Sequence, residues 1–252
     1  VLFRSKVRVV HAGCGVNALS GLQKSCQFNI LQDHVGLISV AHQAVLRLSS
    51  FSNMVDMKTT HTSLPFAGHT LHFVEFDPAS FREQDLLWLP HYAQLQHAGR
   101  KRKTEHLAGR IAAIYALREY GYKCVPAIGE LRQPVWPTGV YGSISHCGTT
   151  ALAVVSRQPI GIDIEEIFSV QTARELTDNI ITPAEHERLA ECGLTFSLAL
   201  TLAFSAKESA FKASEIQTDA GFLDYQIGNC QHQQMNISGP NGDRSEEHTS
   251  EL

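Results

Sequence analysis

Residues 161–166 read Gly-Ile-Asp-Ile-Glu-Glu, and their pattern makes a definite prediction about local structure. Isoleucines at 160, 162 and 164 alternate with glycine and acidic residues, and this period of two predicts a strand over residues 160–167. Alternate side chains of a strand share a face, so Asp163 and Glu165 are expected together on the exposed side. The isoleucines are expected in the core.

Residues 204–212, Phe-Ser-Ala-Lys-Glu-Ser-Ala-Phe-Lys, predict a helix on which Glu208 and Lys212 are neighbours one turn apart. Together with Asp163 and Glu165, they bring carboxylates and an ammonium group to one place. Carboxylate oxygens are the ligands that Mg²⁺ shares with substrate phosphates, so this set is typical of a divalent cation beside a phosphate-bearing substrate. The plainer alternatives are a solvated strand face and a surface i,i+4 ion pair.

The rest of the chain predicts a mixed α/β protein. Periodicity and turn residues predict strands at 70–76, 141–146 and 151–156, and helices at 100–120 and 194–214. A further helix should begin at Thr182-Pro-Ala-Glu185, where proline stands in the first helical position and glutamate completes a capping box.

The motif Gly-x-Asp-x-Glu, followed by Phe-Ser-x-Lys-Glu-Ser-x-x-Lys, resembles the 4′-phosphopantetheinyl transferases of the broad-specificity, surfactin-synthetase-activating type. The chain is most similar to the enterobactin synthase component D branch in three further segments, which are residues 102–110 (Arg-Lys-Thr-Glu-His-Leu-Ala-Gly-Arg), 134–137 (Pro-Val-Trp-Pro) and 142–146 (Gly-Ser-Ile-Ser-His). The resemblance covers about residues 54–227. It implies an α/β (α+β) fold of two similar lobes, with the active site in the cleft between them.

The resemblance implies a metal site and two catalytic residues. Mg²⁺ is expected on Asp163, Glu165 and Glu208, with Glu208 either the third ligand or the general base. Lys212 is expected to contact coenzyme A and to act in catalysis.

The resemblance also implies that Ser145 and His146 bind the nucleotide phosphates. The basic run at the start of the 100–120 helix supplies Arg100, Arg102 and Lys103 as further candidates for contacts with coenzyme A. Such a run is otherwise a solvated helix end or an electrostatic patch for nucleic acid.

The implied function is transfer of the 4′-phosphopantetheine group of coenzyme A to a serine of an apo carrier protein. The implied partners are peptidyl or aryl carrier domains of a nonribosomal peptide synthetase that makes an enterobactin-type siderophore. The protein is expected to be monomeric, with no nucleic-acid partner. The alternatives are a metal-dependent nucleic-acid-binding or nuclease domain, and an inactive transferase fragment.

The two ends do not match the family motifs. Residues 1–53 are interpreted as translated upstream or adapter sequence, with the natural start at Met54 or Met57. Residues 54–159 are expected to form the N-terminal lobe and 160–227 a truncated C-terminal lobe. Residues 228–252, rich in Gly, Asn, Gln and Ser, are expected to be a disordered frameshift or adapter tail.

Composition sets broad limits on the class of protein. A hydrophobic content of 43%, a charged content of 18% and a net charge of −4 are ordinary for a globular protein and give no general attraction to nucleic acid. Within residues 54–227, Cys124, Cys147 and Cys192 lack paired spacing, which favours free thiols in the reducing cytoplasm. The family resemblance adds association with a synthetase complex as an alternative to a free cytoplasmic protein. No stretch reaches the roughly 18 apolar residues of a membrane span.

Overall fold

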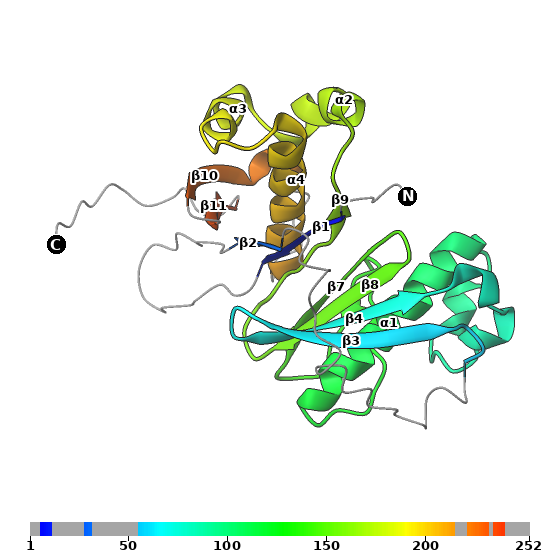
Figure 1. The fold of residues 1–252 in the computed structure, drawn as a ribbon. Coiled ribbons are helices and arrows are strands. Elements are labelled where there is room, and N and C mark those ends of the chain that lie inside the picture. Colours follow the sequence, from blue (N-terminus) through cyan, green and yellow to red (C-terminus); the bar gives the residue numbers. More distant parts are fainter. Residues whose placement is uncertain (1–5, 12–27, 32–54, 215–220, 232–233, 240–252) are drawn as a thin grey trace, which may run out of the picture.

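The computed structural model describes residues 6–11, 28–31, 55–214, 221–231 and 234–239, whose arrangement is shown in Figure 1. The strands are β1 (Lys6–His11), β2 (Phe28–Leu31), β3 (Thr59–Phe66), β4 (His69–Phe76), β5 (Ala127–Ile128), β6 (Pro134–Val135), β7 (Tyr141–Cys147), β8 (Thr150–Ser156), β9 (Glu165–Glu166), β10 (Gln226–Gln231) and β11 (Gln234–Ser238). The α-helices are α1 (Arg100–Glu119), α2 (Val170–Ile180), α3 (Pro183–Ala190) and α4 (Phe196–Ala213). The fold is mixed α/β with antiparallel sheets, so the predicted fold class is confirmed.

A four-stranded antiparallel sheet in the order β3-β4-β8-β7 is the centre of the first half of the molecule. The predicted strands correspond to β4, β7 and β8, whereas β3 was not predicted. Its sequence, Thr-Thr-His-Thr-Ser-Leu-Pro-Phe, shows no apolar alternation, and most of the strand is not buried. Its place at the edge of the sheet explains this pattern.

Helix α1 covers one face of this sheet, and its bounds agree with the predicted helix. Leu107 and Leu117 of α1 pack with Val74 of β4 and Ala153 of β8 in one buried cluster. The helix and the sheet are close here: a Cβ atom built on Gly109 would lie 2.9 Å from Ile144 Cγ2 of β7. Small residues at this contact therefore let α1 lie directly on the strands.

The opposite face of the sheet is covered by residues 160–164. Phe73 and Leu152 from the sheet pack with Ile160, Ile162 and Ile164, all of them buried. The isoleucines are therefore in the core as predicted. The predicted strand is wrong over most of its length, because only Glu165–Glu166 pair as β9 and residues 160–164 run beside β7 without a strand ladder.

The second core surrounds α4, which lies beside α2, α3, β10 and β11 in the upper part of Figure 1. Leu200 and Ala203 of α4 are buried there against Ile180 and Leu189. The predicted capping box at the start of α3 is present, with the Thr182 and Glu185 side chains each bonded to the other residue's backbone. None of the helices in the described ranges has the length and apolar character needed to cross a membrane.

The prediction of disorder after residue 227 is wrong for the part of the tail that the structure describes. Strands β10 and β11 form an antiparallel hairpin there. Met235 and Ile237 are buried at 3% and 2% exposure, whereas Asn236 between them is exposed. The polar composition hid this short alternation, which is enough to cover the apolar side of α4. Residues 240–252 lie outside the described ranges.

The first 53 residues were predicted to contribute no domain, and this stays a prediction. The structure describes two short strands within that segment. Strand β1 pairs with β2, and through Lys6 and Val7 it also pairs with Glu166 and Glu165 of β9. An edge strand with free backbone groups accepts a partner through backbone hydrogen bonds alone, so the pairing needs no family motif. The remaining residues of that segment, with the predicted start at Met54, lie outside the described ranges.

Candidate functional site

Gly161 brings the two motifs into contact. A Cβ atom built on Gly161 would lie 1.8 Å from the backbone oxygen of Ser209 and 2.9 Å from the backbone nitrogen of Ala213, both in α4. Only a residue without a side chain permits this approach of one backbone to another. The acidic segment is therefore held between the sheet on one side and α4 on the other.

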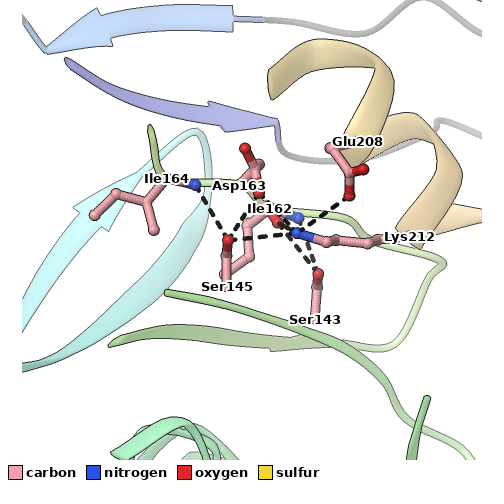
Figure 2. Close-up of polar contacts among 7 residues, drawn as sticks. All are labelled: Ser143, Ser145, Ile162, Asp163, Ile164, Glu208 and Lys212. Carbon is pink, nitrogen blue, oxygen red and sulfur yellow. Dashed lines mark hydrogen bonds and ion pairs between the residues drawn. The ribbon is translucent and has the colours of Figure 1, made fainter. Parts of the chain in front are cut away.

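Lys212 joins α4 to this acidic segment, as Figure 2 shows. Its Nζ lies 2.7 Å from Asp163 Oδ1 and donates more weakly to Ser145 Oγ and to the carbonyl of Ile162, each at 3.4 Å. Its distance to Glu208 Oε2 is 3.7 Å. The predicted neighbours Glu208 and Lys212 thus form the i,i+4 pair, and the same ammonium also reaches the other motif.

Two serines of β7 hold the acidic segment in place. Ser145 Oγ donates to Asp163 Oδ1 at 2.7 Å and accepts the backbone N–H of Ile164 at 3.3 Å. Ser143 Oγ accepts the N–H of Ile162 at 3.0 Å. These side chains replace the backbone ladder that a strand would have supplied. Ser143 was not predicted, although its spacing of two from Ser145 on one strand face was a usable signal.

Asp163 is buried, which corrects the expectation of an exposed carboxylate. Its side chain is 3% exposed, and its Oδ2 atom is buried with no hydrogen-bond partner among the described residues. Period-two alternation placed it on the solvent side, but α4 and β7 close over that side. A buried carboxylate oxygen without a partner is a costly feature, and such features concentrate at functional sites.

Burial raises the pKa of Glu165 to about 7, and repulsion from Asp163 and Glu208 adds to the effect although Lys212 opposes it. Burial also raises the pKa of Glu208, again against the opposing charge of Lys212 and with repulsion from Asp163. The carboxylates of Asp163, Glu165 and Glu208 therefore repel one another at a site that is partly shielded from water. Such a group favours an added cation.

Among the residues that the structure describes, no three His, Cys, Asp or Glu side chains are arranged to hold a metal ion as they stand. The Lys212 ammonium is the cation that contacts Asp163 here. The assignment of Asp163, Glu165 and Glu208 as metal ligands therefore stays a prediction.

His146 lies at the end of β7 beside the same site. Its Nδ1 is 3.8 Å from Glu105 Oε1 of α1, a residue that the sequence patterns did not single out. Burial lowers the pKa of His146; Glu105 opposes this effect, and the charges of Arg102 and Lys212 reinforce it. Ser145 and His146 are thus next to the acidic segment, and their binding of phosphate stays a prediction.

The three predicted basic residues of α1 point to different partners. Arg100 donates to the carbonyl oxygens of Pro78 and Phe81 at 2.9 and 2.8 Å, and Lys103 Nζ binds Glu83 at 2.8 Å. Arg102 is exposed, and its side chain makes no hydrogen bond or ion pair with any described residue.

Arg102 lies close enough to His146 and to Arg110 for its charge to lower the pKa of each. Arg110 is buried, and burial lowers its pKa to about 10. Its Nε atom has no partner in the described part of the chain. Of the three predicted basic residues, Arg102 is therefore the one whose charge acts on His146.

Two known family models match consecutive parts of the chain. The model described as the 4′-phosphopantetheinyl transferase N-terminal domain matches residues 91–156, and that of the 4′-phosphopantetheinyl transferase superfamily matches residues 159–250. Enterobactin synthase component D of Escherichia coli strain K12 is 91% identical over 185 residues, which are 73% of this chain and 90% of that protein.

The chain belongs to the 4′-phosphopantetheinyl transferase superfamily. Enterobactin synthase component D of Salmonella typhimurium strain LT2 is 64% identical over 167 residues, covering 66% of this chain and 71% of that protein. The 4′-phosphopantetheinyl transferase PptT of Mycobacterium tuberculosis is 34% identical over 121 residues, covering 45% of this chain and 51% of that protein.

These matches confirm the family and the branch that the motifs indicated. The superfamily match runs to residue 250, so the expectation that the resemblance ends near residue 227 is wrong. The first match ends at residue 156 and the second begins at residue 159, which supports a division into lobes near Pro159. That division stays a prediction.

Proposed function

We propose that the protein transfers the 4′-phosphopantetheine group of coenzyme A to a serine of apo carrier-protein domains that serve enterobactin-type siderophore synthesis. The observation that carries the proposal is the 91% identity to an enterobactin synthase component D over 90% of that protein's length. The assembled motif supports it, since the segment that carries Asp163 meets Glu208 and Lys212 of α4.

The acidic group fits a divalent cation of the Mg²⁺ type. The unpartnered Oδ2 of Asp163 and the raised pKa of Glu165 both favour a bound cation over a bare cluster of carboxylates. Asp163, Glu165 and Glu208 would hold the ion, and bound there it would offset charge on the pyrophosphate of coenzyme A.

The residues of the chain itself supply the proton transfer and the charge stabilisation. The serine oxygen of the carrier attacks the β-phosphorus, the new P–O bond forms, and the bond to the bridging oxygen breaks. Adenosine 3′,5′-bisphosphate leaves. A Glu208 carboxylate oxygen accepts the serine proton, and the raised pKa of Glu208 makes it a better base than an exposed glutamate. Lys212 and His146 stabilise the charge that develops on the phosphate oxygens.

Arg102 is the residue of the basic run that we assign to the phosphates of coenzyme A. Its guanidinium is exposed beside His146, whereas Arg100 and Lys103 are bonded to other parts of the chain. Guanidinium groups bind phosphate through paired hydrogen bonds. An exposed arginine whose side chain has no partner among the described residues is therefore suited to binding the phosphates of coenzyme A.

The test compares Arg102→Ala with the matched variant Arg100→Ala by calorimetric titration with coenzyme A. Loss of Arg102 should weaken binding roughly ten- to a hundred-fold, since a hydrogen bond to a charged group contributes about 1.5–3 kcal/mol. Arg100→Ala should retain affinity and lose stability. The reverse pattern would move the phosphate contact to Arg100.

No observation favours the nuclease alternative, and both family matches oppose it. Binding to nucleic acid would fall steeply with salt and would not compete with coenzyme A. The compartment remains a prediction. Cys124, Cys147 and Cys192 form no disulfide bonds, which suits the reducing cytoplasm.

A further inference from the structure

Lys207 is the lysine of the Phe-Ser-Ala-Lys-Glu-Ser motif, and it does not face the site. It lies directly before Glu208 in α4, but its side chain is 0% exposed. Its Nζ forms an ion pair with Glu185 Oε1 at 2.8 Å and donates to the carbonyl oxygen of Ile180 at 2.8 Å. Both contacts lie in the interior, away from Asp163 and Lys212.

Glu185, the partner of Lys207, makes polar contacts through both of its carboxylate oxygens. Besides Lys207, its Oε1 accepts the backbone N–H of Ile227 at 2.7 Å. Its Oε2 accepts the backbone N–H of Thr182 at 2.7 Å and the Thr182 hydroxyl at 3.1 Å. The side chain is 1% exposed. Both carboxylate oxygens of Glu185 thus accept from donors of other elements or of the cap of α3.

These contacts join four elements at one point. Lys207 belongs to α4, Ile180 to the last turn of α2, Glu185 to the first turn of α3 and Ile227 to β10. We define Lys207, Glu185, Ile180, Thr182 and Ile227 as the buried node. Because each contact is directional, the node restricts rotation of α4 about its axis as well as its distance from its neighbours.

We propose, on the basis of the function proposed above, that Lys207 is a positioning residue that sets the rotation of α4 so that Glu208 and Lys212 face Asp163. The helix is held by two ammonium groups on different sides. Lys207 fixes it to the buried node, and Lys212 fixes it to the segment that carries Asp163. Glu208 lies between these two lysines in the sequence of α4.

The energetic character of the node agrees with a positioning role. A buried ion pair loses hydration on both partners, so it adds little net stability compared with well-packed apolar side chains. Removing one partner, however, leaves a buried charge without compensation. A buried pair with all its hydrogen bonds formed fixes geometry strictly while adding little stability. Such a pair is suited to orienting a helix that carries catalytic groups, because small displacements of those groups lower the rate.

The first test measures kcat and KM for coenzyme A in Lys207→Met and Glu185→Gln, with Lys123→Met as an exposed lysine control, and the values are corrected for the folded fraction. Lys207→Met should lower kcat about 10- to 100-fold while KM for coenzyme A changes by less than about threefold. Glu185→Gln should act in the same direction, and the double variant should lose less than the product of the single losses.

Two outcomes of this measurement would overturn the proposal. A raised KM with unchanged kcat in Lys207→Met would make Lys207 a substrate contact. A lower melting temperature with unchanged kcat per folded molecule would make the node merely structural.

The second test uses the unmodified protein and separates burial of Lys207 in the node from contact with coenzyme A, whether or not the variants fold. Lysines are acetylated with an amine-reactive ester, with and without coenzyme A, and the sites are located by mass spectrometry. Lys207 should remain unlabelled in both conditions and become labelled only on denaturation. Labelling of Lys207 that coenzyme A suppresses would overturn the proposal. Because labelling does not require turnover, this result is independent of whether the proposed transfer itself is observed.

Discussion

Lys212 Nζ and Asp163 Oδ1 lie 2.7 Å apart, so the last turn of α4 is bonded to the acidic segment that follows β8. This contact joins the halves of the family motif, which are separated by about 50 residues in the sequence. It also explains why Asp163 is buried, because the helix that supplies Lys212 covers it.

Asp163→Asn should abolish transfer, with at least a hundredfold loss of kcat, because the amide keeps the shape but not the charge that faces Lys212 and the proposed cation. The neighbouring Glu166→Gln serves as the control and should retain activity. Initial rates at saturating Mg²⁺ check both variants. Wild-type rates for Asp163→Asn would remove Asp163 from the metal site.

Lys212→Ala should weaken coenzyme A binding roughly ten- to a hundred-fold, since contacts to a charged group contribute about 1.5–3 kcal/mol. Binding of the apo carrier should change far less. Titration with each ligand separates the two effects, and the exposed Lys123→Ala is the control. Unchanged affinity for coenzyme A would reduce Lys212 to an intramolecular ion-pair partner.

Gly161→Ala should strongly destabilise the protein, because the added Cβ would lie 1.8 Å from the Ser209 backbone oxygen and α4 must move away. Gly99 has no atom within 4 Å of a built Cβ, so Gly99→Ala is the matched control. Thermal melts of the two variants make the comparison. Equal melting temperatures would show that the close approach of the segment to α4 is absent in solution.

Met235→Ala should lower the free energy of unfolding by about 2–5 kcal/mol, the usual cost of truncating a buried methionine. Asn236→Ala, one residue further along β11 on the exposed side, should have little effect. Urea denaturation measures both. If the two variants were equally stable, β10 and β11 would not be part of the core around α4.

The stability of the protein should fall as the pH drops from about 6.5 towards 4. Burial lowers the pKa of His61 and of His72 from 6.5 to about 4, with the charge of His72 adding to the shift of His61. The unfolded chain therefore binds more protons than the folded one in this window, so acid favours unfolding. Each histidine contributes at most about 1.4 kcal/mol per pH unit.

Urea unfolding across this pH range checks the histidine prediction. His72→Gln should give a shallower dependence on pH, whereas the exposed His97→Gln is the control. An identical pH dependence for His72→Gln and the wild type would remove the His61–His72 pair from the account of acid stability.

The sequence predicted the structure correctly where the structure depends on local interactions. The helix from Arg100, the capping box at Thr182 and Glu185, and the buried isoleucines follow from local periodicity and capping, and all are present. The pairing of Glu208 with Lys212 follows from helical spacing in the same way.

The errors arose where the outcome depends on residues distant in the chain. Asp163 alternates correctly with the isoleucines, yet α4 covers it, and no local pattern contains that information. Lys207 and Glu185 are 22 positions apart, and their burial follows only from the packing of α3 on α4. Composition likewise concealed β11, where two apolar residues are sufficient because α4 supplies the rest of the core.

The most direct test of the proposed function is mass spectrometry of an apo peptidyl or aryl carrier domain after incubation with coenzyme A, Mg²⁺ and this protein. The account predicts that the carrier gains one phosphopantetheine group on its serine, and that Asp163→Asn does not catalyse this gain. An unmodified carrier in the presence of the folded, coenzyme A-binding wild-type protein would contradict it.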